Sequence, residues 1–168
     1  MDDLTGLISD WPVPTVAVGV TTPEGTIAVG GDTTWVTRIA SVSKLLVGMS
    51  ALVALEEETI DLAEPAGPEG ATVEHLLAHA SGLAFDSDRM LSVPGRRRIY
   101  SNTGIEVFAA HLERRAGIDF AEYLQAGVLD PLGMRHTVLR GSPAHGIWSN
   151  VDDLLVFADL LSASVSVS

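Results

Sequence analysis

Apolar and small residues alternate with the period of a β-strand over residues 16–20. A Pro-Glu-Gly turn signal stands at 23–25, and a β-branched run follows at 26–29. This pattern predicts a β-hairpin over residues 15–29. Residues 35–39 are expected to be extended as well. Before the hairpin, four apolar residues at helical spacing predict a short amphipathic helix: Leu4, Leu7, Ile8 and Trp11.

Residues 41–57 have the spacing of a helix with almost no polar face. Their large apolar residues are Leu45, Leu46, Val47, Met49, Leu52, Val53 and Leu55. A helix that is apolar all round is usually buried in the middle of a domain. We therefore expect this helix to be covered on all sides.

Two shorter helical segments and a long loop follow. Thr72 is a typical N-cap for a helix that runs to His79. The amphipathic segment 104–115 is closed by Gly117, a typical helix C-terminus. Between these two helices, residues 85–99 form a long loop, and loops of that length inside a compact domain are commonly functional.

The last helix is predicted near the end of the chain. Ser149 with Asp152 resembles a capping box, and the apolar pattern ends near Leu161. Residues 162–168 alternate serine with small apolar residues and carry no closing signal. We expect them to form a frayed tail.

Composition limits the classes of function. The chain has 168 residues, 22 acidic and 10 basic, and a formal net charge of −12. Nucleic-acid binding needs a basic face, so nucleic acid is not an expected partner. The chain has no cysteine, which excludes disulfides, thiolate catalysis and sulfur-ligated metals. No apolar run is long enough to span a bilayer and no signal peptide is evident, so a cytoplasmic protein without a membrane span is predicted.

The only lysine, Lys44, stands three residues after Ser41 at the start of the apolar helix. Residues three apart share a helix face, so the amine can reach the hydroxyl. A hydroxyl is a weak nucleophile until a neighbouring base takes its proton. Burial and the helix N-terminus both disfavour the charged form of the amine, which would suit it to that task. The alternative is an N-cap serine followed by a surface lysine.

Tyr100 and Asn102 follow the long loop and precede the segment 104–115. A tyrosine hydroxyl near a lysine can be held partly deprotonated and relay a proton to a leaving group. An asparagine amide offers donors and an acceptor that can position a substrate carbonyl. The alternative is that Tyr100 is a half-buried strand residue and Asn102 the N-cap of the next helix.

Four motifs occur together and in order. They are RIASVSK at 38–44, HLLAHASGL at 75–83, PG at 94–95 before YSN at 100–102, and PLGM at 131–134. This ordered set resembles the serine β-lactamase-related proteins, which include class C β-lactamases, D-alanyl-D-alanine carboxypeptidases and family VIII esterases. The resemblance extends from about residue 14 to residue 161.

The resemblance implies roles for four residues. Ser41 would be the acylated nucleophile, Lys44 its proton partner, Tyr100 a general base or acid, and Asn102 a substrate-positioning side chain. Ser101 receives no role. The implied reaction is acyl transfer through a covalent acyl-enzyme that water hydrolyses. Neither a metal nor another cofactor is implied.

Two other groups were considered as sites. His75 and His79 are four residues apart, as zinc ligands on a helix can be, but no metalloprotease motif surrounds them and no third ligand is evident. In the family this segment is structural. Arg96, Arg97 and Arg98 could attract an anionic substrate, although a solvated loop is the commoner explanation of such a short charge run.

The family's third motif, Lys-Thr-Gly or His-x-Gly on a late strand, is missing from this sequence. In the family that strand supplies the second backbone N–H of the oxyanion hole, and its loss would leave the hairpin with an open edge. Three explanations compete: a truncated serine hydrolase, a short form completed by a homodimer or a second chain, and a non-catalytic binding or scaffold protein.

The resulting prediction is one incomplete α+β domain of the β-lactamase/transpeptidase-like fold, without its C-terminal strands. Its antiparallel sheet would come from residues 13–40, and its helical region with the motifs from 41–161. The predicted function is a serine hydrolase acting on a small-molecule ester or amide, with esterase activity slightly preferred over β-lactamase or D,D-peptidase activity. An inactive binding or scaffold protein remains the alternative.

Overall fold

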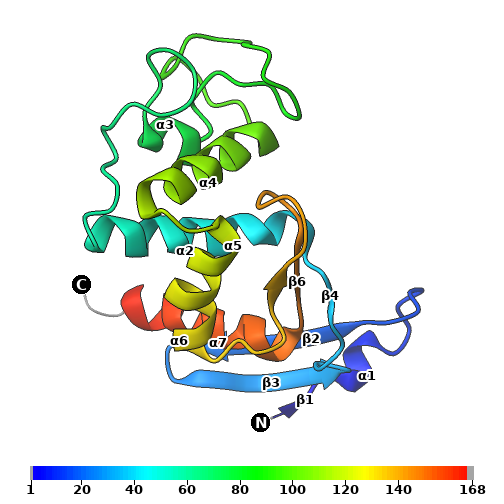
Figure 1. Ribbon diagram of the computed structural model, residues 1–168. Coiled ribbons are helices and arrows are strands. Elements are labelled where there is room, and N and C mark those ends of the chain that lie inside the picture. The colour runs from blue at the N-terminus through cyan, green and yellow to red at the C-terminus, as the bar shows by residue number, and fades with distance from the viewer. Residues whose placement is uncertain (1, 166–168) are drawn as a thin grey trace. The chain divides into compact units, whose positions relative to one another are not determined.

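The computed structural model describes residues 2–165 and divides into two compact units (Figure 1). Unit 1 comprises residues 2–38, 129–138 and 148–165, and unit 2 comprises residues 39–128 and 139–147. The chain as a whole consists of helices and small, mostly antiparallel sheets, which is the predicted α+β class. The single incomplete domain stays a prediction. No helix among residues 2–165 has the length and apolar character needed to cross a membrane.

The predicted hairpin forms the sheet of unit 1. β2 (Ala17–Thr22) pairs antiparallel with β3 (Gly25–Gly31), with a bulge after Val20. Gly25 turns the chain with a φ of 110°, a backbone conformation that residues other than glycine rarely adopt. β1 (Asp2–Asp3) adds to β3 in parallel, so β2 is an edge strand of this three-stranded sheet. The predicted N-terminal helix is only the four residues of α1 (Thr5–Ile8).

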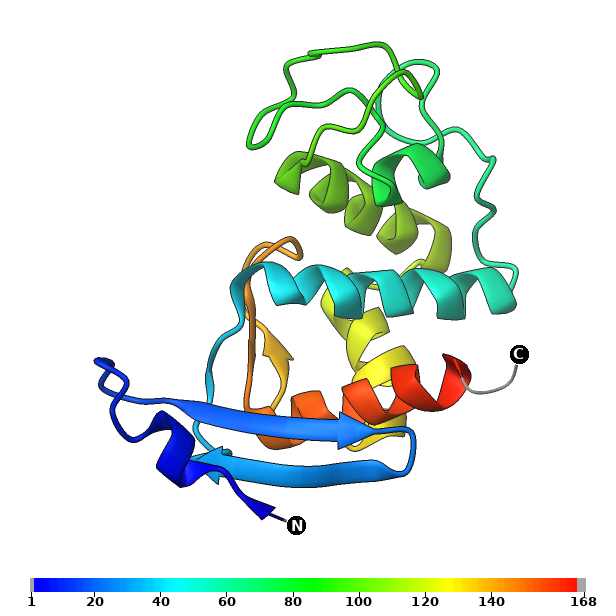
Figure 2. The same cartoon turned by 180° about the vertical axis from the view of Figure 1, so that it is seen from behind.

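α7 (Val151–Val165) runs along this hairpin (Figure 2). Gly19 of β2 permits the approach, because a Cβ there would lie 2.7 Å from the Leu155 side chain. The helix N-terminus is capped by Asn150, whose Oδ1 accepts a hydrogen bond from the Asp153 N–H at 2.9 Å, and not by Ser149 as predicted. α7 extends four residues past the predicted end at Leu161, and residues 166–168 of the predicted frayed tail lie outside the described residues.

A second small sheet has the order β4-β6-β5. Its strands are β4 (Thr37–Arg38), β5 (Val138–Leu139) and β6 (Ile147–Ser149). Within unit 1, Thr37 is paired with Ser149, and the buried Ser149 hydroxyl lies 2.7 Å from the Thr137 hydroxyl. Thr137 in turn donates to the Asp153 carboxylate at 2.7 Å. These polar groups are buried but fully partnered, as stable interiors require.

Unit 2 is helical. It contains η1 (Ala40–Val42), α2 (Ser43–Glu56), α3 (Val73–Leu77), α4 (Asn102–Ala116) and α5 (Phe120–Leu124). A π-helical turn, Gln125–Leu129, leads towards the short α6 (Asp130–Leu132). α4 packs against α2, α3 and α5, and both views place it alongside α2 (Figures 1 and 2). The core residues between these helices are Leu46, Val47, Leu76, Phe108, Leu112 and Leu124.

α2 is not covered on all sides, contrary to the expectation from its sequence. Leu46, Val47 and Ala54 are fully buried, whereas Leu45 and Leu52 are each 55% exposed. In the part of the chain that the structure describes, the other helices of unit 2 cover only one face of α2. The opposite face leaves apolar side chains in contact with solvent.

Candidate active site

Ser41 lies in the 3-10 turn η1, immediately before α2 begins at Ser43. The prediction of a regular helix from residue 41 is therefore corrected by two residues. Ala40 precedes Ser41 with a φ of 48°, which is unusual for a residue with a side chain. Strain of this kind is often found at functional sites. The turn leaves the Ser41 side chain exposed to solvent.

Ser43 holds this turn in place. Its buried hydroxyl donates to the Ala40 carbonyl at 2.6 Å and accepts from the Ile147 N–H at 3.1 Å. Ile39 N–H donates to the Ile147 carbonyl at 3.0 Å. The segment that carries Ser41 is thus tied on both sides to residue 147.

Lys44 stands at the centre of the site and makes three hydrogen bonds through Nζ. The acceptors are Ser41 Oγ at 3.3 Å, Asn102 Oδ1 at 2.7 Å and the Ala144 carbonyl at 2.8 Å. An ammonium group has three N–H donors and no acceptor, so these three acceptors match its charged form. The geometry therefore favours a lysine that holds a positive charge beside Ser41.

Tyr100 completes the group around Lys44. The Lys44 Nζ lies 4.8 Å from the centroid of the Tyr100 ring. Interactions with Lys44 and with the Ser41 hydroxyl hold the pKa of the Tyr100 phenol below its ordinary value, against the opposing effect of burial. The charges of Lys44 and Arg98 act in the same direction. Tyr100 is therefore the group in this cluster that is best suited to accept a proton from Ser41.

Two aromatic side chains flank the Tyr100 ring. The His79 ring lies 4.6 Å from it, centroid to centroid, at 47°, and the Phe85 ring lies 5.9 Å away at 25°. Burial lowers the pKa of His79, as do the charges of Arg98 and Lys44. Its Nδ1 accepts from the Ser101 N–H at 3.2 Å, which a neutral ring can do. These rings fix where the phenol stands.

Asn102 is the first residue of α4, and its amide joins two charged groups. Its Oδ1 accepts from Lys44, and its Nδ2 donates to Asp86 Oδ1 at 2.7 Å. Asn102 does not cap the helix, contrary to the alternative considered from the sequence. Ser101 does so, because its Oγ accepts from the Gly104 N–H at 2.9 Å and donates to the Ala84 carbonyl at 2.6 Å. The Asn102 side chain is therefore left for the site.

The structure brings all four predicted site residues together: Ser41, Lys44, Tyr100 and Asn102. Sequence reasoning missed Asp86 and the Ala144 carbonyl. No local signal marks a backbone carbonyl as a lysine acceptor. Asp86 does stand in the loop 85–99 that its length marks as functional, and this was the available clue.

His75 and His79 do not form a pair on one helix face. α3 ends at Leu77, and His79 follows it with a φ of 58°. His75 instead accepts the Thr72 N–H at 3.2 Å through Nδ1, as part of the predicted N-terminal cap of α3. Within residues 2–165, no three His, Asp or Glu side chains are grouped in a way that could hold a metal ion.

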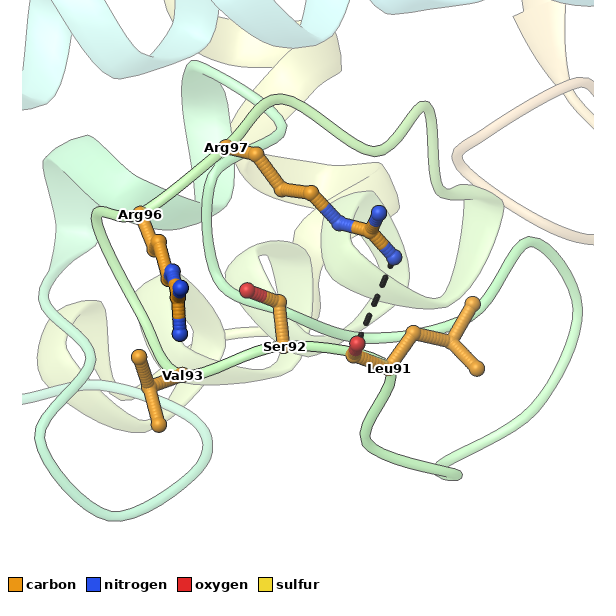
Figure 3. Close-up of a pocket in the computed structure, with 5 residues that line it drawn as sticks. All are labelled: Leu91, Ser92, Val93, Arg96 and Arg97. Atoms are coloured by element: carbon orange, nitrogen blue, oxygen red, sulfur yellow. Dashed lines mark hydrogen bonds between the residues drawn. The ribbon is translucent and has the colours of Figure 1, made fainter.

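The arginine run contributes to a separate hollow of about 440 Å³. Its lining residues are Leu91, Ser92, Val93, Arg96 and Arg97. Figure 3 shows that both arginine side chains extend towards segment 91–93, where Arg97 Nη2 donates to the Leu91 carbonyl at 3.3 Å. None of the four predicted site residues lines this hollow. Attraction of an anionic substrate by these arginines stays a prediction.

Comparison with known proteins gives a consistent result. A family model described as Beta-lactamase matches residues 10–167. Penicillin-binding protein 4* of Bacillus subtilis (strain 168) is 26% identical over an alignment of 133 residues, and the match covers 60% of this chain and 30% of that protein. A beta-lactamase of Escherichia coli (strain K12) is 27% identical over an alignment of 134 residues, and the match covers 64% of this chain and 36% of that protein.

Solved structures share the fold. The crystal structure of a beta-lactamase from Mycobacterium bovis is 49% identical, with a TM-score of 0.90 over 93% of this chain and 58% of that one. An octameric penicillin-binding protein homologue from Pyrococcus abyssi has a TM-score of 0.80 at 17% identity, over 94% of this chain and 54% of that one. The β-lactamase/transpeptidase-like fold is thus confirmed. The chain spans about a third of the curated relatives' length and somewhat more than half of the solved chains.

Proposed function

Because the chain belongs to the β-lactamase family, we propose that it acts as a serine hydrolase on an ester or amide, through an acyl-enzyme on Ser41. One observation carries this proposal. The Lys44 ammonium lies within hydrogen-bond distance of the Ser41 hydroxyl, and both groups lower the pKa of the Tyr100 phenol. A nucleophile, a proton acceptor and a fixed positive charge are thus in one place.

The proposed first half-reaction transfers the acyl group to Ser41. Ser41 Oγ bonds to the carbonyl carbon, its proton passes to the Tyr100 phenolate, and the carbonyl electrons move to oxygen. The Ser41 N–H, in the turn η1 just before α2, is a donor suited to that oxyanion. The bond to the leaving oxygen or nitrogen then breaks, and Tyr100 returns the proton to the leaving group.

Hydrolysis of the acyl-enzyme repeats these steps with water as the nucleophile. Tyr100 takes the water proton, and Ser41 Oγ recovers a proton as it leaves the carbonyl carbon. Throughout both half-reactions the Lys44 charge stabilises the phenolate form of Tyr100. In this proposal Lys44 is an electrostatic partner of the base, and Tyr100 is the base itself.

Asn102 is proposed to position the substrate. A primary amide has two N–H donors, and only one of them is needed for the hydrogen bond to Asp86. The second can donate to a substrate carbonyl without breaking the contact with Lys44. This supports the substrate-binding role predicted for Asn102.

The test is covalent labelling of the folded 168-residue chain with a fluorophosphonate and, separately, with a fluorescent penicillin. Mass spectrometry of the digested protein should find the adduct on Ser41. Labelling by both probes indicates β-lactamase-like or D,D-peptidase-like recognition, and labelling by the fluorophosphonate alone indicates an esterase. A folded chain that neither probe labels would contradict the hydrolase proposal and favour the binding or scaffold protein.

A second polypeptide is a further part of this proposal. The edge strand β2 carries the exposed Val20, and separately η1 exposes Val42 and α2 exposes Leu45 and Leu52. Exposed strand edges and apolar faces are usual places of association. A second copy of the chain is the first occupant to test, by light scattering over a range of concentrations. A cytoplasmic location stays a prediction.

A further inference from the structure

Asp86 contacts a residue of the candidate active site, although the sequence did not single it out. Its Oδ1 accepts from Asn102 Nδ2 at 2.7 Å. The preceding residue is held by the backbone, because Phe85 O accepts from the N–H groups of Asn102 at 2.8 Å and Thr103 at 3.3 Å. Segment 85–86 is thus fixed on the N-terminus of α4, where the Asn102 side chain begins.

The chemistry of the three linked groups allows only one orientation of the Asn102 amide. Lys44 Nζ only donates and an ionised carboxylate only accepts, whereas the amide has a donating end and an accepting end. Turning the amide over would place donor against donor at Lys44 and acceptor against acceptor at Asp86. The carboxylate therefore selects the orientation in which Oδ1 faces Lys44.

We propose that Asp86 is a positioning residue, which fixes the Asn102 amide so that it holds the Lys44 ammonium beside Ser41 and Tyr100. Asp86 itself is exposed, while Asn102 is buried. A substitution at an exposed position seldom threatens the fold, so the proposal is open to a direct test. The kinetic arm of that test rests on the proposed function, and the labelling arm does not.

The labelling arm uses the only lysine of the chain as a reporter. Amine-acetylating reagents react with the free-base amine, whereas the three hydrogen bonds that Nζ donates are those of an ammonium. Cleavage after arginine separates the amino terminus, in peptide 1–38, from Lys44, in peptide 39–89. Mass spectrometry then measures the acetylation rate of Lys44 alone.

The variants are Asp86→Ala, Asp86→Asn and, as the matched control in the same loop, Asp88→Ala. Asp86→Ala should raise the acetylation rate of Lys44 roughly tenfold. Without Asp86 the Asn102 amide is no longer fixed, so its Oδ1 is a weaker acceptor for the charge-assisted hydrogen bond from Lys44. Asp86→Asn retains an acceptor oxygen and should restore a rate near that of the wild type. If Asp86→Ala and Asp88→Ala give the same rate as the wild type, the proposal is overturned.

The kinetic arm measures how fast Ser41 is covalently modified by whichever of the two probes labels the wild type. It compares Asp86→Ala, Asn102→Ala and the double variant. Asp86→Ala should acylate about tenfold more slowly, and should add no further loss in the Asn102→Ala background. Additive losses would show that Asp86 acts independently of Asn102 and would refute the positioning role. If the wild type is not acylated at all, the proposed function fails, while the Lys44 acetylation rates still decide the role of Asp86.

Discussion

The two helices that begin at the site, α2 and α4, use a serine in opposite ways. At α4, Ser101 occupies the N-cap position and is fully buried. Its hydroxyl accepts from the Gly104 N–H and donates to the Ala84 carbonyl. At α2, Val42 occupies that position, no side chain caps the helix, and Ser41 lies one residue upstream with its side chain exposed. The serine at the cap position bonds to backbone groups, whereas the serine one residue before the cap position is exposed and available for the proposed reaction.

A third serine completes this contrast. Ser43 takes over the structural task at α2, because its hydroxyl bonds to the Ala40 carbonyl and to the Ile147 N–H. The proposed nucleophile and the structural hydroxyl are therefore separate, two residues apart in the chain. Substitutions at these positions should have separate effects on acylation and on stability.

The largest effect is expected from Ser41→Ala, which removes the nucleophile. No covalent adduct should form with any probe that labels the wild type, and the thermal midpoint should hardly change because Ser41 is exposed and caps nothing. Mass spectrometry and circular dichroism measure the two outcomes. The matched variant Ser43→Ala should be less stable by about 1–3 kcal/mol. An adduct on Ser41→Ala would place the nucleophile elsewhere.

Tyr100→Phe should slow acylation by about 10²- to 10⁴-fold, the usual contribution of a positioned general base. The phenyl ring retains its contacts with His79 and Phe85, so stability should be unchanged. Stopped-flow or quenched-flow labelling measures the rate. An unchanged rate would mean that Tyr100 is not the proton acceptor of Ser41.

The pH dependence of acylation tests how Lys44 acts. The phenolate is the active form in the proposed mechanism, and a lowered pKa means that it forms at lower pH than an ordinary phenol, whose pKa is about 10. The acylation rate should rise with pH and level off below that value. Lys44→Met removes the largest cause of the lowered pKa, so its rising limb should move to higher pH. If the acylation rates of Lys44→Met and the wild type rose over the same pH range, the electrostatic role of Lys44 would be contradicted.

Ser101→Ala tests the other side of the comparison. Losing the cap and leaving the buried Ala84 carbonyl without its donor should lower the free energy of unfolding by about 1–3 kcal/mol. The acylation rate of the folded fraction should change much less than in Tyr100→Phe. Urea unfolding gives the first quantity and probe labelling the second. Equal stability of variant and wild type would show that the cap contributes nothing.

The sequence predicted the elements better than it predicted their ends. The hairpin, α2 and α4 follow from local periodicity, and Gly117 does end α4 in the left-handed conformation. The choice between Ser101 and Asn102 as the cap could not be made locally, because it depends on Ala84 and on Lys44, 58 residues away from Asn102. The four predicted site residues could be named because they belong to motifs, whereas Ala144, 100 residues from Lys44, contributes only a backbone carbonyl.

A small effect on stability, and a specific one on the site, is expected at Ala40. A left-handed φ costs a residue with a side chain roughly 1–2 kcal/mol, and glycine avoids that cost but loses more entropy on folding. Ala40→Gly should therefore alter stability by no more than about 1 kcal/mol. It should slow acylation all the same, because the turn that presents Ser41 becomes free to adopt other conformations.

Glu58→Gly is the matched control, since Glu58 has a φ of 56° just beyond the other end of α2. It should alter stability by a similar amount and leave acylation unchanged. Equal acylation rates in both variants and the wild type would mean that the strained turn plays no part in presenting the nucleophile.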